Sequence, residues 1–173
     1  MTSELPTSHE IPAEPVPRAG RGVAFAATDI RQALGLLGER VAARWLMARG
    51  WTVVAHRFRS GHRDLDLVVR QGSLVAFVEV KARRATGYGG PLGALHWRKR
   101  RELVRSAQVW MARHGAADET YRFDVVGVLL EPSSGRGRRG ADGLWVAPPS
   151  APGGQLRARV RHVADAFQVP SGS

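Results

Sequence analysis

Two short runs of sequence give the clearest indication of the fold. They are Asp64-Leu65-Asp66-Leu67-Val68-Val69 and Leu74-Val75-Ala76-Phe77-Val78-Glu79-Val80-Lys81. Both are rich in residues that favour strands, and a glycine-containing turn separates them, which predicts a β-hairpin. Side chains on a strand alternate between its two faces, so Glu79 shares a face with Lys81, and Asp66 lies opposite its leucine neighbours. If the two polar faces meet in register, two carboxylates and an ammonium converge on one side of the hairpin.

Two carboxylates at one point are costly, because like charges repel and burial removes their water. A divalent cation resolves this repulsion and supplies chemistry at the same point. The chain has no cysteine, so a metal has only carboxylates and histidines to bind, and hard oxygen ligands favour magnesium or manganese over zinc. The alternative is that Asp66, Glu79 and Lys81 line the wet face of a half-exposed sheet, which is common for charged residues on strands.

A third acid, Glu39, lies in a predicted helix that begins near Ile30 and ends at Gly50. Apolar residues recur there at three- and four-residue steps, and Gly50 suits a left-handed cap. Glu39 lies between Leu37 and Val41, at the edge of the apolar stripe. That position lets it reach a site at the rim of the sheet, although a solvent-facing glutamate is the alternative.

The remaining elements complete the order αβββαβ, an α/β fold with a mixed α+β sheet core and helices flanking a central sheet. We predict strands at 51–58 and 121–130, a glycine-rich loop at 82–95, a helix at 96–114, an edge strand at 144–146 and a short closing helix or turn at 159–167. Composition divides the chain into a tail at 1–28, a single domain at 29–169 with a flexible insertion at 131–143, and a short tail at 170–173. The length of 173 residues suits one domain with one hydrophobic core.

The formal net charge of +11 favours a polyanionic partner, because each phosphate that a basic group neutralises releases counterions. We expect nucleic acid, with DNA favoured over RNA, and a solvated basic surface is the alternative. The helix at 96–114 has a basic face that suits backbone phosphates. The basic residues of this face are Arg98, Lys99, Arg100, Arg101 and Arg105. We also expect Tyr88, in the loop before the helix, to contact nucleic acid. For Trp97, packing in the core or a loop is favoured over stacking on unpaired bases.

No run approaches the roughly 18 apolar residues that a spanning helix needs. The first residues of the chain also lack the basic start and apolar run of a signal peptide. We therefore expect no membrane association and a cytoplasmic location.

A series of motifs runs along residues 33–168, namely Gly38-Glu39, Ala42-Ala43-Arg44-Trp45-Leu46, Asp64-Leu65-Asp66-Leu67-Val68, Phe77-Val78-Glu79-Val80-Lys81, Tyr88-Gly89-Gly90, Lys99, Arg122-Phe123-Asp124-Val125-Val126 and Asp165-Ala166-Phe167. In this order they resemble the YraN family of bacterial endonuclease-like proteins, whose core is similar to Holliday-junction resolvases and other PD-(D/E)xK nucleases. The resemblance implies a restriction-endonuclease-like fold. The chain departs from the family at Arg63-Asp64-Leu65-Asp66, where the family usually has Gly-Glu-Ile-Asp. Because Asp66 is intact, this departure bears on substrate fit rather than on metal binding.

The resemblance also implies roles for the site residues. Asp66 and Glu79 would bind magnesium or manganese, assisted by the Val80 carbonyl. Lys81 would position the attacking water or stabilise the charged phosphorane. Glu39 would complete the metal sphere, directly or through water.

Three functions follow as hypotheses. The first is a metal-dependent nuclease that hydrolyses phosphodiester bonds in structured or single-stranded DNA. The second is a catalytically silent nucleic-acid-binding module with a nuclease fold, and the third is a basic adaptor for an acidic protein. The intact acidic set favours the nuclease, because acids near phosphates repel DNA unless a cation is present. Cleavage of branched junctions would imply a homodimer, since two matched cuts need two sites.

Overall fold

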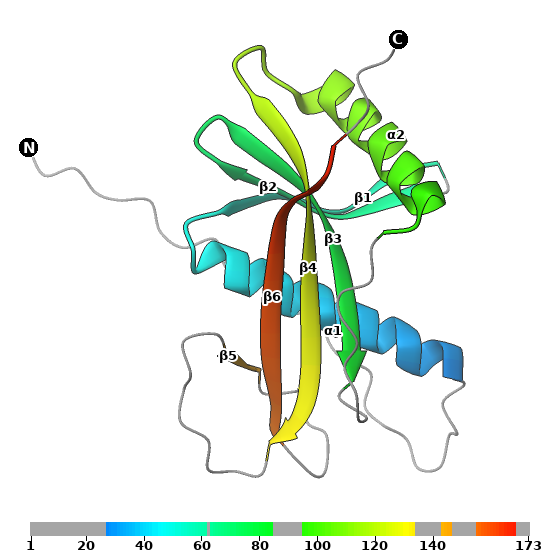
Figure 1. Cartoon of the computed structure of the whole chain (residues 1–173), viewed down its shortest axis with the longest axis vertical. Coiled ribbons are helices and arrows are strands. Elements are labelled where there is room, and N and C mark those ends of the chain that lie inside the picture. Colours follow the sequence, from blue (N-terminus) through cyan, green and yellow to red (C-terminus); the bar gives the residue numbers. More distant parts are fainter. Residues whose placement is uncertain (1–26, 62, 85–94, 134–142, 147–154, 169–173) are drawn as a thin grey trace, which may run out of the picture.

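The computed structural model describes residues 27–61, 63–84, 95–133, 143–146 and 155–168 (Figure 1). The elements in chain order are α1 (Ala27–Met47), β1 (Thr52–Ser60), β2 (Arg63–Gln71), β3 (Leu74–Arg84), α2 (Trp97–His114), β4 (Thr120–Ser133), β5 (Gly143–Val146) and β6 (Gln155–Phe167). Neither helix in these ranges is long and apolar enough to cross a membrane.

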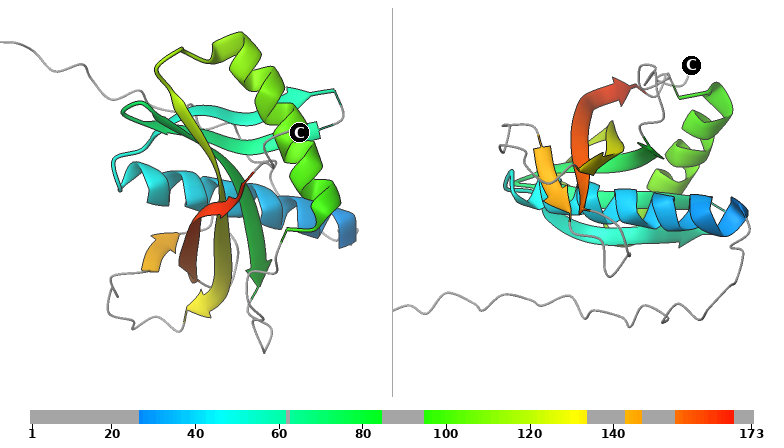
Figure 2. Two further views of the ribbon diagram at one scale, coloured as in Figure 1. Left: turned by 45° about the horizontal axis from the view of Figure 1, so that its top comes forward. Right: turned by 90° about the horizontal axis from the view of Figure 1, so that it is seen from below.

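The strands form one mixed sheet of six in the order β1-β2-β3-β4-β6-β5. Only the β3–β4 pair is parallel, and α2 makes the crossover that a parallel pair requires. Two hydrophobic clusters use alternate residues of the same strands, one with α1 and the other with α2. The two helices therefore cover opposite faces of the sheet (Figure 2). This arrangement confirms the predicted α/β class, with β3 and β4 as the central strands.

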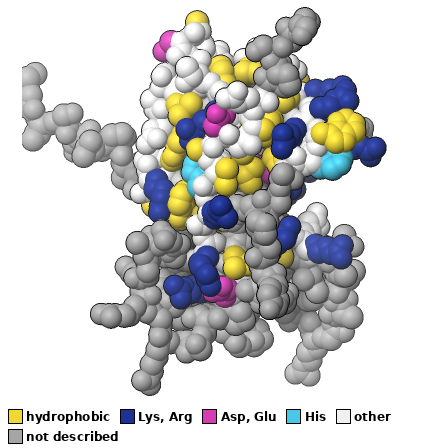
Figure 3. Space-filling model, in the orientation of Figure 1, with side chains coloured by type: hydrophobic (Ala, Val, Ile, Leu, Met, Phe, Trp, Pro, Cys, Tyr) yellow, Lys and Arg dark blue, Asp and Glu magenta, His cyan; other side chains and the backbone are white. Residues whose placement is uncertain are grey.

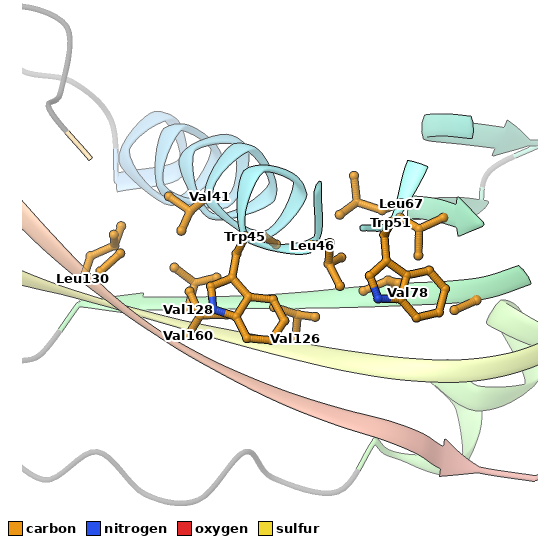
Figure 4. Packing of buried hydrophobic residues seen from close by; sticks show 14 residues of the cluster. Val41, Trp45, Leu46, Trp51, Leu67, Val78, Val126, Val128, Leu130 and Val160 are labelled. Carbon is orange, nitrogen blue, oxygen red and sulfur yellow. The ribbon is translucent and has the colours of Figure 1, made fainter. Parts of the chain in front are cut away.

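The first cluster lies between α1 and the sheet (Figure 4). Val41, Trp45 and Leu46 project from α1 toward the valines of β3, β4 and β6, as the helical spacing predicted. Leu46 is fully buried, and burying such a side chain stabilises a fold by about 1.5–3 kcal/mol. Gly50, which follows the helix, has a φ of 84°, the left-handed conformation expected of a cap.

The second cluster lies between α2 and the opposite face. Leu103, Ala107 and Trp110 are its buried helical residues. The ring of Phe77 on β3 lies 5.6 Å from that of Trp110 and 5.5 Å from that of Phe123, measured between centroids. Aromatic pairs at this separation add to the gain from burial, so α2 is held firmly over β3.

The β2–β3 ladder stops before either strand ends. Its last pair is Leu67 with Val78, although β2 continues along β1 and β3 continues along β4. The β1–β2 hairpin thus diverges from the rest of the sheet beyond this pair (Figure 1). The next residue on each strand is an acid, Asp66 on β2 and Glu79 on β3. We call this place the parting point.

Our prediction of a short closing helix or turn at 159–167 was wrong. The segment belongs to strand β6, which pairs antiparallel with β4. Buried and exposed residues alternate from Ala158 to Arg161, as in a strand. Beyond that the register with β4 shifts, and Asp165 has a φ of 50°. This bulge breaks the two-residue period and leaves apolar residues at a helix-like spacing.

Strand ends account for smaller differences. The edge strand at 144–146 is confirmed as β5, whereas β4 reaches Ser133 and β3 reaches Arg84, further than predicted. The predicted insertion at 131–143 therefore begins and ends within strands, and its centre lies outside the described residues. The tail at 1–28 lies outside them too, except for the first two residues of α1, as do most of the loop at 82–95 and the tail at 170–173.

Two glycines of α1 differ in what a side chain would meet. A Cβ at Gly38 would overlap the Cβ of Ala82 on β3, whereas a Cβ at Gly35 would meet no atom within 4 Å. Gly38 thus allows the helix to approach β3 closely beside Glu39.

We expect Gly38→Ala to destabilise the protein by about 1–3 kcal/mol through overpacking. Gly35→Ala is the matched control and should stabilise it by about 0.5–1 kcal/mol, because alanine has less conformational entropy to lose. Urea denaturation followed by circular dichroism measures both. Equal effects of the two substitutions would contradict the close approach.

Candidate active site

Asp66 and Glu79 come together at the parting point. Each lies next to the last β2–β3 pair on its own strand, and the two are close enough for the charge of Glu79 to act on the carboxyl of Asp66. The backbone N–H of Val80 donates to Asp66 Oδ2 at 2.7 Å. Glu79 is only 4% exposed. Two carboxylates therefore share a largely buried space.

Two ammonium groups neutralise Glu79. Lys81 Nζ lies 2.8 Å from Glu79 Oε1, and Lys99 Nζ lies 3.1 Å from Glu79 Oε2. The structure thus brings together Asp66, Glu79 and Lys81, the three residues that the hairpin pattern singled out. Lys99 was assigned to the basic face of α2 instead. Its contact with Glu79 was missed because it depends on how α2 crosses the sheet.

Two main causes raise the pKa of Asp66 to about 7: burial, which contributes most, and the negative charge of Glu79. The hydrogen bond from Val80 and the charge of Lys99 oppose this shift, whereas the charge of Glu39 adds to it. For Lys99, burial lowers the pKa, but the attraction of Glu79 and Asp66 prevails and raises it. Asp66 and Glu79 therefore repel each other, and the positive charge of Lys99 offsets this repulsion in part.

Glu39 faces β1. It is 8% exposed, and its Oε2 lies 2.8 Å from His56 Nε2 and 3.8 Å from Arg57 Nε. Neighbours on a regular strand project to opposite faces, but Arg57 has a φ of 51°. This left-handed residue interrupts the alternation, so both side chains reach the same carboxylate. We had predicted no role for His56, because it has no ligand spacing with His62 or His114 in the sequence.

The donor set suits a hard divalent cation. Among the described residues, no group of three or more acidic or histidine side chains is arranged to hold a metal. Magnesium commonly binds through one or two carboxylates and keeps several waters, and its binding by Asp66 and Glu79 stays a prediction. The buried Oε2 atoms of Glu39 and Glu79 have no hydrogen bond of good geometry, although cationic groups lie near them. The contact that involves Val80 uses its N–H, and the assignment of its carbonyl to a metal stays a prediction.

The predicted nucleic-acid surface lies along α2. Arg98, Arg101 and Arg105 are exposed, and Arg100 is half-buried with its Nε donating to the Leu95 carbonyl at 2.9 Å. Tyr88 lies outside the described residues. Of the two roles that we preferred for Trp97, packing in the core or in a loop, the structure contradicts the first, because the residue is 54% exposed.

A further buried acid, Asp124 on β4, is remote from this pair in sequence and has other partners. It accepts hydrogen bonds from His162 at 2.8 Å, from the backbone N–H of Asp165 at 3.0 Å and from Arg122. Burial alone would raise its pKa, but these hydrogen bonds outweigh burial and lower it. Asp124 therefore ties β4 to the bulge of β6. The sequence showed it only as part of a motif.

The raised pKa of Asp66 makes stability depend on pH. The folded state binds the proton more tightly than the unfolded state, whose pKa is near 3.8. The stabilisation that this proton gives is complete at low pH and is lost as the pH rises to about 7. Asp66→Asn cannot titrate, so we expect its stability relative to the wild type to increase over this window by up to about 4 kcal/mol, since each pKa unit corresponds to about 1.4 kcal/mol. Urea denaturation with chelator present tests this, and parallel pH curves for the two proteins would refute it.

Comparison with known proteins places this site within one family. The model of "Uncharacterised protein family UPF0102" matches residues 38–128, which include the parting point and all of α2. A UPF0102 protein of Nocardia farcinica is 43% identical over 59% of this chain and 80% of its own length. One of Alkaliphilus metalliredigens is 36% identical over 57% of this chain and 87% of its own length. One of Geobacter sulfurreducens is 32% identical over 79% of this chain and 89% of its own length. The chain belongs to the UPF0102 family, which is the YraN family that its motifs resemble.

Proposed function

We propose that this protein is a magnesium-dependent nuclease that hydrolyses phosphodiester bonds in structured or single-stranded DNA, with Asp66 and Glu79 at its catalytic centre. The observation that carries the proposal is the placement of two carboxylates at the parting point, with the ammonium of Lys81 2.8 Å from Glu79. A fold gains nothing in stability from such a pair, because burial and repulsion disfavour the charged forms. A site for a cation explains the arrangement.

A bound magnesium or manganese ion polarises a phosphate oxygen and lowers the pKa of a coordinated water. Asp66 and Glu79 would hold the ion, with the Val80 carbonyl as a further ligand and Glu39 acting directly or through water. The hydrogen bond from the Val80 N–H holds Asp66 Oδ2, and the other oxygen of this carboxylate would bind the ion. Lys81 would donate to the attacking water or to the phosphate, where charge accumulates in the transition state.

The basic residues of α2 would hold the substrate backbone. Phosphate contacts position nucleic acid without reading its sequence, and Arg98, Arg101 and Arg105 are exposed for that purpose. DNA is favoured over RNA by the resemblance to junction resolvases. If the substrate is a branched junction, a homodimer follows, because two matched cuts require two centres. We place this activity in the cytoplasm.

One observation favours the second hypothesis, a catalytically silent module that binds nucleic acid. Both oxygens of Glu79 already face ammonium groups, from Lys81 and Lys99. If these groups neutralise Glu79 permanently, the centre cannot take up a cation, and the fold serves binding alone.

We expect the purified protein to cleave end-labelled single-stranded, duplex or four-way-junction DNA with magnesium or manganese, and not with chelator. Asp66→Asn and Glu79→Gln should each lower the cleavage rate by at least about 100-fold, because each removes a charge that would hold the ion. Asp118→Asn is the matched control, since it removes an exposed carboxylate from the turn before β4 and should leave the rate unchanged.

Binding of these substrates without cleavage, under every metal condition, would overturn the nuclease proposal for them and support the silent module. Cleavage that survives Asp66→Asn would instead place the catalytic centre elsewhere in the chain.

A further inference from the structure

The outer side of α2 carries a groove that the carboxylate site does not use. It has a volume of about 410 Å³ and lies between α2 and the end of β6. One wall is formed by α2, with Trp97, Arg101, Val104 and Arg105. The lining is completed by Phe167 and Gln168 at the end of β6. These α2 residues recur at helical spacing on one face, whereas Lys99, which contacts Glu79, lies on another.

The groove combines an exposed indole with uncompensated positive charge. Trp97 is 54% exposed, and the guanidinium carbons of Arg98 and Arg101 lie 5.4 Å and 5.6 Å from the centroid of its ring. None of the ion pairs found among the described residues includes Arg98, Arg101 or Arg105. Figure 3 shows basic side chains gathered around a hydrophobic one at this end of α2, next to a histidine.

The floor of the groove is apolar as well. Phe167 lies under the guanidinium of Arg100, at 5.5 Å from ring centroid to carbon, and stacks on Phe123 at 4.6 Å between centroids. A rigid aromatic floor beside arginines suits a ligand that is flat and apolar on one part and anionic on another. An acidic peptide would satisfy the arginines but would leave the indole without a partner.

We infer that this groove binds an unpaired nucleotide of a single-stranded nucleic-acid segment, with its base stacked on Trp97 and its phosphates at Arg101 and Arg105. Base stacking on aromatic side chains and backbone contacts to basic ones are the usual means of binding single strands. A continuous duplex hides the faces of its bases and offers nothing to the indole. This inference deepens the proposed function, because it names the substrate class as DNA with an unpaired segment next to the cleavage centre.

The groove and the carboxylates share α2 as their support. Lys99 anchors the start of the helix to Glu79 at 3.1 Å, two residues from Trp97 in sequence. A strand held in the groove is thereby kept on the same helix that reaches the catalytic centre. Single strands, flaps and the open centre of a junction all supply an unpaired base.

The test measures binding in chelator, so that cleavage plays no part. Fluorescence anisotropy would follow the full-length protein with a labelled 20-nucleotide oligothymidine and with an abasic oligomer of the same length. We expect Trp97→Ala to weaken oligothymidine binding by about 5- to 150-fold, the range for loss of one stacked base, and to change binding of the abasic oligomer by less than about twofold. Trp97→Phe should retain most of the affinity. Met47→Ala, which alters an exposed apolar residue on α1, should change neither.

The arginines have a different expected effect. Replacing Arg101 and Arg105 together with glutamine should weaken both oligomers and reduce the slope of log affinity against log salt by about 1.4, at about 0.7 for each phosphate of a single strand. An unchanged slope would show that these arginines do not contact the phosphates.

Several results would overturn the inference. These are no binding of oligothymidine by the wild type, an equal loss for both oligomers with Trp97→Ala, or no loss for either. A change in sedimentation coefficient of the free protein with Trp97→Ala would show that a second copy fills the groove instead. Base-dependent binding at Trp97 without any cleavage would support the groove and contradict the nuclease. Cleavage that Trp97→Ala leaves unchanged, without base-dependent binding, would support the nuclease and contradict the role of the groove.

Discussion

The structure depends on one electrostatic constraint, the meeting of Asp66 and Glu79 where the β1–β2 hairpin leaves the rest of the sheet. Their mutual repulsion and burial hold the pKa of Asp66 near 7. Lys81 and Lys99 offset this cost by approaching Glu79 from β3 and from α2. The parting point is thus the place where the chain brings opposite charges from separate elements together, and it is where we propose that a divalent cation binds.

The two packed faces of the sheet hold that point in place. On one face Gly38 lets α1 approach Ala82 closely, which brings Glu39 near the charge of Asp66. On the other face the aromatic cluster around Phe77 fixes α2, and with it Lys99. A hairpin alone would be free to shift its register, whereas here both of its faces are packed. The positions of the charged groups therefore follow from the apolar packing around them.

Much of this arrangement was predictable, because the hairpin signals are local. Alternation and a glycine turn predicted that Asp66, Glu79 and Lys81 would converge, and helical periodicity predicted both helices. The contacts of Lys99 with Glu79 and of His56 with Glu39 were not predictable, because they join elements distant in sequence. Strand β6 was misassigned because its bulge at Asp165 imitates a helical period. The exposure of Trp97 was missed because an aromatic residue at a helix start resembles a core residue in sequence.

The central claim is that Asp66 and Glu79 form a site for a divalent cation. Isothermal titration of manganese into the wild type and into Asp66→Asn, at pH 8, tests it most directly, since Asp66 is then mostly ionised. We predict a saturable site in the wild type and its loss in Asp66→Asn. Equal binding by both proteins, or no binding by the wild type, would contradict it.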